Sequence, residues 1–155
     1  MKFTKIEVTG DSSYISNVTY WIDNGTANAD MYVKRTLNYG LRVFVDLQMK
    51  LADSKKYQSL FSYDVDVCKL LNEFFRESLL RSWYRNLLKY SNFMENCPIM
   101  EGFYYIRKLA LEPNSIPPYL RSGDYRLCCT AYYGKRNSKK QRSVSNLTAY
   151  MQILS

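Results

Sequence analysis

The residues from Leu41 to Leu51 alternate between apolar and polar side chains, and Phe44 is the one apolar residue on the polar side. A period of two places alternate side chains on opposite faces of an extended chain, so this segment is predicted to form a half-buried β-strand. A strand of this kind favours a fold with an apolar interior enclosed between layers. The apolar set comprises Leu41, Val43, Val45, Leu47, Met49 and Leu51.

Seven other segments are β-like and are separated by short turns such as Gly10-Asp11 and Asn24-Gly25. About eight short strands are typical of a sandwich or a barrel. A chain of 155 residues without a Pro/Gly linker or a repeat is expected to form one domain over 1–155. The seven segments cover 3–8, 14–22, 30–37, 57–67, 103–109, 125–133 and 147–153.

Residues 69–90 break the β pattern. Their apolar residues occur in doublets four to five positions apart, which predicts one amphipathic helix lying across the mouth or flank of the sandwich. Cys68 and Cys97 bracket this helix. A disulfide between them would close a loop of ~30 residues and add roughly 3–4 kcal/mol to the stability. Two buried free thiols in a cytosolic protein are the alternative that these residues leave open.

Several motifs around this bracket resemble a large insect family of small secreted proteins that includes the CheB chemosensory proteins. The family is related to the ML lipid-recognition superfamily, which includes ganglioside-activator and sterol-transfer proteins. The resemblance extends from about Met31 to Ile153, whereas Val8 and Tyr20 stand where relatives carry an early cysteine pair. The motifs are D-V-C-K-L-L at 66–71, N-C-P-I-M-E-G-F-Y-Y at 96–105 and I-P-P-Y-L-R-S-G-D-Y-R-L at 116–127.

The resemblance implies an immunoglobulin-like sandwich of two antiparallel sheets, parted to hold an acyl chain, a sterol or another apolar ligand. It also implies secretion, a Cys68–Cys97 disulfide and no enzymatic activity. Some insect members are linked to taste hairs and contact-pheromone detection. The adjacent Cys128 and Cys129 have no early partner, so both are expected to be reduced, with a bond between them as the rarer option.

The residues themselves offer no catalytic motif. The chain has no histidine, which excludes the commonest general base, Ser-His-Asp and Cys-His arrangements and histidine-bound zinc. No glycine-rich phosphate loop occurs, and the four cysteines form no C-x-x-C pair. Asp64 and Asp66 are more simply explained as the solvated face of a strand than as an acid–base pair. We therefore expect no enzyme, no cofactor and no metal.

The formal net charge of +8 points to acidic partners. Five of the cationic residues fall between Lys135 and Arg142, where Gly134 and Asn137 predict the tip of a hairpin. The N-terminus lacks the apolar stretch of a signal peptide, so the chain is either cytosolic or a mature, secreted form. Three N-glycosylation sequons, at Asn17, Asn24 and Asn146, mildly favour secretion.

Three functional readings follow. The first is a secreted binder of a lipid, fatty acid or hydrocarbon between the two sheets. The second is a protein-interaction module with a filled core, which assists a membrane receptor through its basic loop. The third, nucleic-acid binding, is disfavoured. For the first reading, the candidate ligand-binding residues are Val43, Val45, Leu47, Leu79, Trp83, Phe103, Tyr105, Leu127 and Met151.

Overall fold

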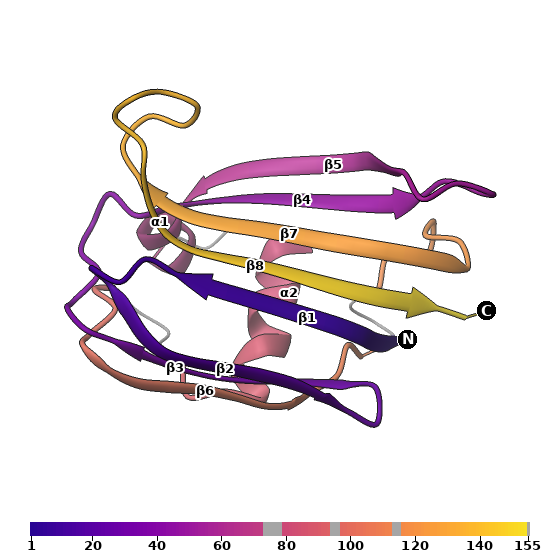
Figure 1. The fold of residues 1–155 in the computed structure, drawn as a ribbon, viewed down its shortest axis with the longest axis horizontal. Coiled ribbons are helices and arrows are strands. Elements are labelled where there is room, and N and C mark those ends of the chain that lie inside the picture. Colours follow the sequence, from indigo (N-terminus) through magenta and orange to yellow (C-terminus); the bar gives the residue numbers. More distant parts are fainter. Residues whose placement is uncertain (73–78, 94–96, 113–115, 155) are drawn as a thin grey trace.

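The computed structural model describes residues 1–72, 79–93, 97–112 and 116–154, and it describes residues 71, 72 and 79–81 by their backbone alone. The predicted β-sandwich is confirmed, because two antiparallel sheets lie face to face (Figure 1). The larger sheet has the order β1-β8-β7-β4-β5 and the smaller one β2-β3-β6. The strands are β1 (Lys2–Gly10), β2 (Ile15–Asp23), β3 (Thr26–Val33), β4 (Arg42–Lys50), β5 (Tyr57–Asp66), β6 (Gly102–Leu109), β7 (Gly123–Tyr133) and β8 (Arg142–Ile153).

Most strand predictions agree with the structure, but the strand expected over 30–37 was placed too late. The turn at Asn24 and Gly25 has positive φ angles of 50° and 75°, and Asp23 pairs directly with Thr26 across it. This tight hairpin brings β3 into register with β2 from its first residue. The weak strand propensity of the small and polar residues at 26–30 hid the start of β3. Leu37 instead forms an isolated bridge with Ile99.

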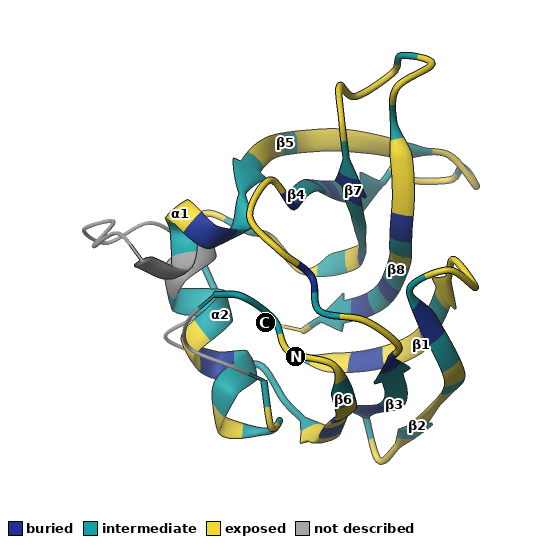
Figure 2. Ribbon diagram, turned by 90° about the vertical axis from the view of Figure 1, so that its left-hand side faces the viewer, coloured by how far each residue is buried: buried dark blue, intermediate teal, exposed yellow. Residues whose placement is uncertain are grey.

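The helical segment contains α1 (Val67–Asn72) and α2 (Leu79–Lys89), and 73–78, the middle of the predicted helix, lie outside the described residues. Asp66 caps α1, because its Oδ1 accepts a hydrogen bond of 3.0 Å from the backbone N–H of Lys69. Among the described residues, no helix is long and apolar enough to cross a membrane. Helix α2 covers the side of the sandwich between β5 and β6, as predicted for the flank (Figure 2).

The Cys68–Cys97 disulfide is present, with a Cα–Cα distance of 5.4 Å. Cys68 lies in α1, directly after β5, and Cys97 precedes β6. The bond therefore ties the chain leaving the larger sheet to the chain entering the smaller one. Both segments return to the same end of the sandwich, and this proximity is what a disulfide requires.

The interior contains two groups of buried apolar residues. The disulfide-end cluster lies near the Leu37–Ile99 bridge and comprises Ile15, Val33, Leu37, Leu41, Tyr104 and Val144. The terminus-end cluster includes residues near both chain termini and comprises Phe3, Ile6, Ala27, Leu47, Tyr125, Ala149 and Met151. All residues of the terminus-end cluster, and Tyr104 of the disulfide-end cluster, border the space described next.

Candidate functional site

A cavity of about 400 Å³ lies between the two sheets. Its walls come from strands of both sheets, from α2 and from the segment 116–120. The volume is within the range of roughly 300–1,000 Å³ that is usual for small-molecule sites. The space is therefore large enough for an apolar guest of several carbon atoms.

The five-stranded sheet supplies one wall through residues of all its strands, most of them at alternate positions. Because side chains two apart point the same way, each strand presents a row of apolar groups to the cavity. The row on β4 is the strict alternation noted in the sequence. The lining residues of these strands are Phe3, Ile6 and Val8 on β1, Val43, Val45 and Leu47 on β4, Val65 on β5, Tyr125, Leu127, Cys129 and Ala131 on β7, and Ser145, Leu147, Ala149, Met151 and Ile153 on β8.

The opposite wall is made by the three-stranded sheet, and small side chains explain why space remains. Ala27 and Ala29 are buried on the inner face of β3, and the larger Met31 of the same strand also lines the cavity. Tyr104 and Ile106 of β6 complete this wall. Alanine side chains cannot reach across the ~10 Å between packed sheets, so the two layers do not fill the volume between them.

Helix α2 forms the flank of the cavity through Trp83, Tyr84, Asn86 and Leu87. The Trp83 and Phe61 rings lie 6.2 Å apart, which joins the helix to β5. The amide of Asn86 is 2% exposed, and its Nδ2 donates a hydrogen bond of 2.9 Å to the carbonyl of residue 110. Its Oδ1 accepts one of 3.4 Å from the N–H of residue 112. A buried side chain with both ends bonded holds the helix against the chain that leaves β6.

Polar groups of the wall are bonded to the protein itself. The Tyr104 hydroxyl donates to the carbonyl of Met100 at 2.6 Å, and the Tyr125 hydroxyl donates to the carbonyl of Arg121 at 2.7 Å. Burial raises the pKa of both tyrosines above the ordinary value, so both remain neutral. The wall accordingly offers apolar contact and few free polar groups.

Asp30 carries the one charged side chain among the described lining residues, and its partner lies on the outer face. The Asp30 carboxylate forms an ion pair with Arg107, whose guanidinium lies 5.3 Å from the Trp21 ring centroid and 5.2 Å from that of Tyr105. Thr19 donates a further hydrogen bond of 3.4 Å to the same carboxylate. These contacts pair the negative charge of Asp30 with residues of the three-stranded sheet.

Cys128 and Cys129 are both free thiols, as expected, and neighbouring positions on β7 send them to opposite faces. Cys129 lines the cavity. Burial raises its pKa to about 12, and the neighbouring Cys128 contributes in the same direction. Cys128 faces the outer side, where its Sγ lies 4.0 Å from Oε1 of Gln48. The cavity wall therefore carries a neutral, weakly nucleophilic thiol.

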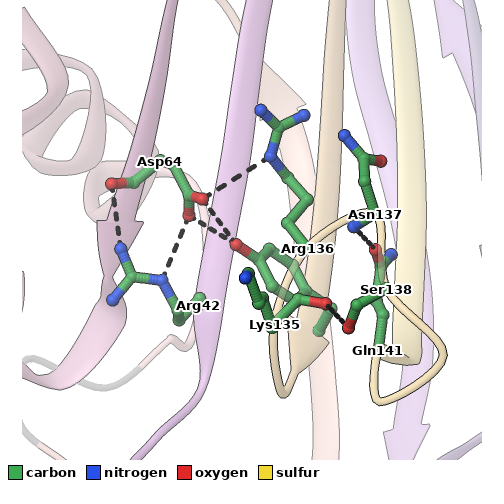
Figure 3. A network of polar contacts seen from close by, with 8 residues as sticks. Arg42, Asp64, Lys135, Arg136, Asn137, Ser138 and Gln141 are labelled. Atoms are coloured by element: carbon green, nitrogen blue, oxygen red, sulfur yellow. Dashed lines mark hydrogen bonds and ion pairs between the residues drawn. The ribbon is translucent and has the colours of Figure 1, made fainter.

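Asp64 and Asp66 have separate structural roles. Asp66 caps α1, whereas Asp64 accepts hydrogen bonds from Arg42 at 3.2 Å and from the Tyr132 hydroxyl at 2.6 Å (Figure 3). Burial, together with the bond to Asp64, raises the pKa of Tyr132, so this hydroxyl remains a donor. The carboxylates are thus bonded on the outer face of the sheet.

Of the nine candidate ligand-binding residues, the structure brings seven into the cavity wall: Val43, Val45, Leu47, Trp83, Tyr105, Leu127 and Met151. Leu79 begins α2, and its side chain lies outside the described part of the chain. Phe103 was placed on the wrong face, because it is 50% exposed on the outer side of β6.

The error at Phe103 has a simple origin. Both faces of β6 carry aromatic or aliphatic residues, so the period of two is present but its phase is ambiguous. The structure turns Tyr104 and Ile106 inward, and Tyr105 touches the wall while its ring packs beside Phe103 at 6.2 Å. Both rings therefore belong to an outer aromatic row.

Several lining residues were not nominated from the sequence. Ala27 and Ala29 gave no signal, because small residues do not mark a strand face. Ile116, Pro117 and Leu120 were noted only as part of a family motif. Val65 and Leu147 follow the same alternation as their neighbours, and extending the pattern would have found them.

The three sequon asparagines are all exposed, which is the placement that glycosylation requires. Asn24 lies in the β2–β3 turn, whereas Asn17 and Asn146 lie on strands. The Asn146 Oδ1 accepts a hydrogen bond of 2.8 Å from Thr130. Within the described residues, no cluster of three or more His, Cys, Asp or Glu side chains is placed to hold a metal.

Comparison with known families gives one match. A family model described as "Protein of unknown function (DUF1091)" matches residues 43–127, more than half of the chain. No curated protein matches the sequence. The matched range begins on β4, contains both disulfide cysteines and ends on β7, so it includes the cavity-lining residues of β4, α2 and β6 but not those of β1, β3 and β8.

Proposed function

Because the chain belongs to the DUF1091 family, whose description leaves its function open, we propose from the cavity that this protein is a non-enzymatic binder or carrier of an apolar ligand. The observation that carries the proposal is the space of about 400 Å³ lined by alternate apolar residues of both sheets. A lipid, fatty acid or hydrocarbon is the ligand class that matches such a lining.

The size of the void gives an energetic reason for a guest. An apolar guest gains about 25 cal/mol for each Å² of this apolar lining that it removes from water. A typical domain has a total stability of only about 5–15 kcal/mol. An apolar wall does not hold water well, because water needs polar partners. Filling the space with an apolar molecule therefore stabilises the folded chain.

The polar groups constrain the ligand further. The tyrosine hydroxyls of the wall bond to backbone carbonyls, and Asp30 is paired on the outer face. A charged head group inside the cavity would lack a partner and would be costly to bury. We therefore expect a neutral ligand, or an amphiphile whose head group remains outside.

The resemblance to the insect CheB-like proteins and the ML superfamily supports the same function. It suggests a secreted carrier, with contact-pheromone detection and a membrane receptor as its biological setting. The Cys68–Cys97 disulfide supports secretion, since such bonds persist in oxidising compartments. The competing reading, an interaction module of the same fold, requires a filled interior, and the cavity favours the carrier.

The test is direct detection of the ligand. Mass spectrometry of an organic extract of the purified native protein should yield a stoichiometric apolar compound, and the delipidated protein should bind a neutral fluorescent fatty-alcohol probe. Leu127→Phe places a larger ring in the cavity and should weaken probe binding about ten-fold by occupying its volume.

The matched control is Ser62→Phe, which adds the same ring to an exposed outward position of β5. It should leave probe binding within about two-fold of the wild type. An empty extract together with no saturable probe binding would defeat the proposal. Equal losses in the two variants would do the same.

A further inference from the structure

The hairpin between β7 and β8 is a cationic surface. It covers residues 134–141, and with Arg142, the first residue of β8, it carries five Lys or Arg residues and no acidic residue. The loop projects from the sandwich beyond the disulfide end of the larger sheet (Figure 1). We call Lys135, Arg136, Lys139, Lys140 and Arg142 the basic hairpin.

The basic hairpin is ordered by its own hydrogen bonds. The Ser138 hydroxyl donates to the carbonyl of Lys135 at 2.6 Å and accepts from the N–H of Lys140 at 3.1 Å. The N–H of Asn137 donates to Oε1 of Gln141 at 2.7 Å. These bonds fix the loop before any partner arrives, which lowers the entropy lost on binding.

One cation fastens the hairpin to the sheet. Arg136 forms an ion pair of 3.6 Å with Asp64, and its guanidinium lies 3.8 Å from the centroid of the Phe44 ring (Figure 3). Asp64 is already bonded to Arg42 and Tyr132. Its single negative charge therefore balances only part of the positive charge gathered around it.

The other four cations of the basic hairpin form no ion pair within the part of the chain that the structure describes. They are Lys135, Lys139, Lys140 and Arg142. A fixed group of unpaired charges attracts a ligand that carries several negative charges.

The composition of the hairpin selects among anionic partners. Residues 134–142 contain no aromatic or aliphatic side chain that could serve as the buried anchor of a protein interface. Nucleic-acid binding without such a ring loses the stacking that contributes to it. Membrane docking likewise lacks an apolar side chain to insert. A sulfated polysaccharide requires charge alone.

We propose that the basic hairpin binds a linear sulfated glycan. Lys135 and the doublet Lys139 and Lys140 lie on either side of the tip at Asn137 and Ser138 and present their charges to sulfate groups along the glycan, while Arg136 holds the hairpin to the sheet. This inference is independent of what the cavity holds, although a glycan partner presupposes the extracellular location of the proposed function.

The experiment compares two double variants of equal charge. Lys139→Gln/Lys140→Gln removes two charges from the hairpin, and Lys55→Gln/Lys56→Gln removes two exposed charges from the β4–β5 turn at the other end of the sheet. Titration with a heparin oligosaccharide should show about ten-fold weaker binding for the hairpin variant and a change within about two-fold for the turn variant. The slope of log Kd against log salt should fall by about two in the hairpin variant alone.

Equal losses in the two variants would overturn the proposal, because binding would then follow net charge. Absence of heparin binding by the wild type would also overturn it. Equally tight, equally hairpin-dependent binding of a poly-glutamate peptide, single-stranded DNA or phosphatidylserine vesicles would assign the surface to another partner. Thermal unfolding and fatty-alcohol probe binding should match the wild type in both variants, so a failure of the cavity proposal would be seen separately.

Discussion

The two buried clusters of this protein differ in how many of their residues border the cavity. Of the six residues of the disulfide-end cluster, only Tyr104 touches the cavity, although Met31, Val67, Phe93 and Ala131, which pack against that cluster, also line it. All seven residues of the terminus-end cluster line it. The terminus-end cluster includes two small residues, Ala27 and Ala149, whereas the disulfide-end cluster contains no alanine.

The Cys68–Cys97 disulfide lies beside the disulfide-end cluster, and we expect its removal to change the stability more than any other substitution proposed here. Replacing Cys68 and Cys97 together by alanine should lower the free energy of unfolding by about 3–4 kcal/mol, because the unfolded chain regains the freedom of a loop of 29 residues. Chemical denaturation measures this change. A loss below about 1 kcal/mol would show that packing alone holds this end together.

Replacing by alanine one leucine that does not line the cavity and one that does should give different losses of stability. Leu41 is 3% exposed and belongs to the disulfide-end cluster, so Leu41→Ala should lower the stability by about 3 kcal/mol by creating a new void. Leu127 already lines the cavity, so Leu127→Ala in the delipidated protein should cost about 2 kcal/mol, the low end of the range for this substitution. Urea unfolding compares the variants. Equal losses of stability would contradict the distinction between a closely packed leucine and one that lines the cavity.

A further difference between the two faces of β7 concerns pH. The pKa of Cys129 is raised from 9.0 to about 12 in the folded state, so the folded protein holds this proton more tightly than the unfolded chain. Its contribution to stability is complete below about pH 9 and is lost as the pH rises towards 12. Stability should therefore fall less steeply in this window for Cys129→Ala than for Cys128→Ala.

Thiol alkylation checks the same difference independently. With Cys129 as the only free thiol, in the Cys128→Ala variant, labelling should be slow at neutral pH and slower still with a bound fatty alcohol. With Cys128 alone, labelling should be insensitive to that ligand, because this side chain lies on the outer face. Ligand protection of Cys128 and not of Cys129 would contradict the assignment of the two faces.

The sequence predicted the parts of the site that depend on local pattern. The alternation on β4 identified Val43, Val45 and Leu47, and the amphipathic segment identified Trp83. It could not set the phase of β6, where both faces are apolar, and so Phe103 was assigned to the wrong side. Pattern reports which positions alternate, whereas the choice between faces depends on which neighbour covers them.

By itself, the sequence determined the layered β architecture, the helix between two cysteines and the basic hairpin, because each follows from periodicity, turn chemistry or charge over neighbouring residues. Only the tertiary structure decided that a cavity remains between the two sheets. A cavity depends on the sum of side-chain volumes that face one another from distant strands, such as Ala29 on β3 and Leu127 on β7. No local pattern contains that sum.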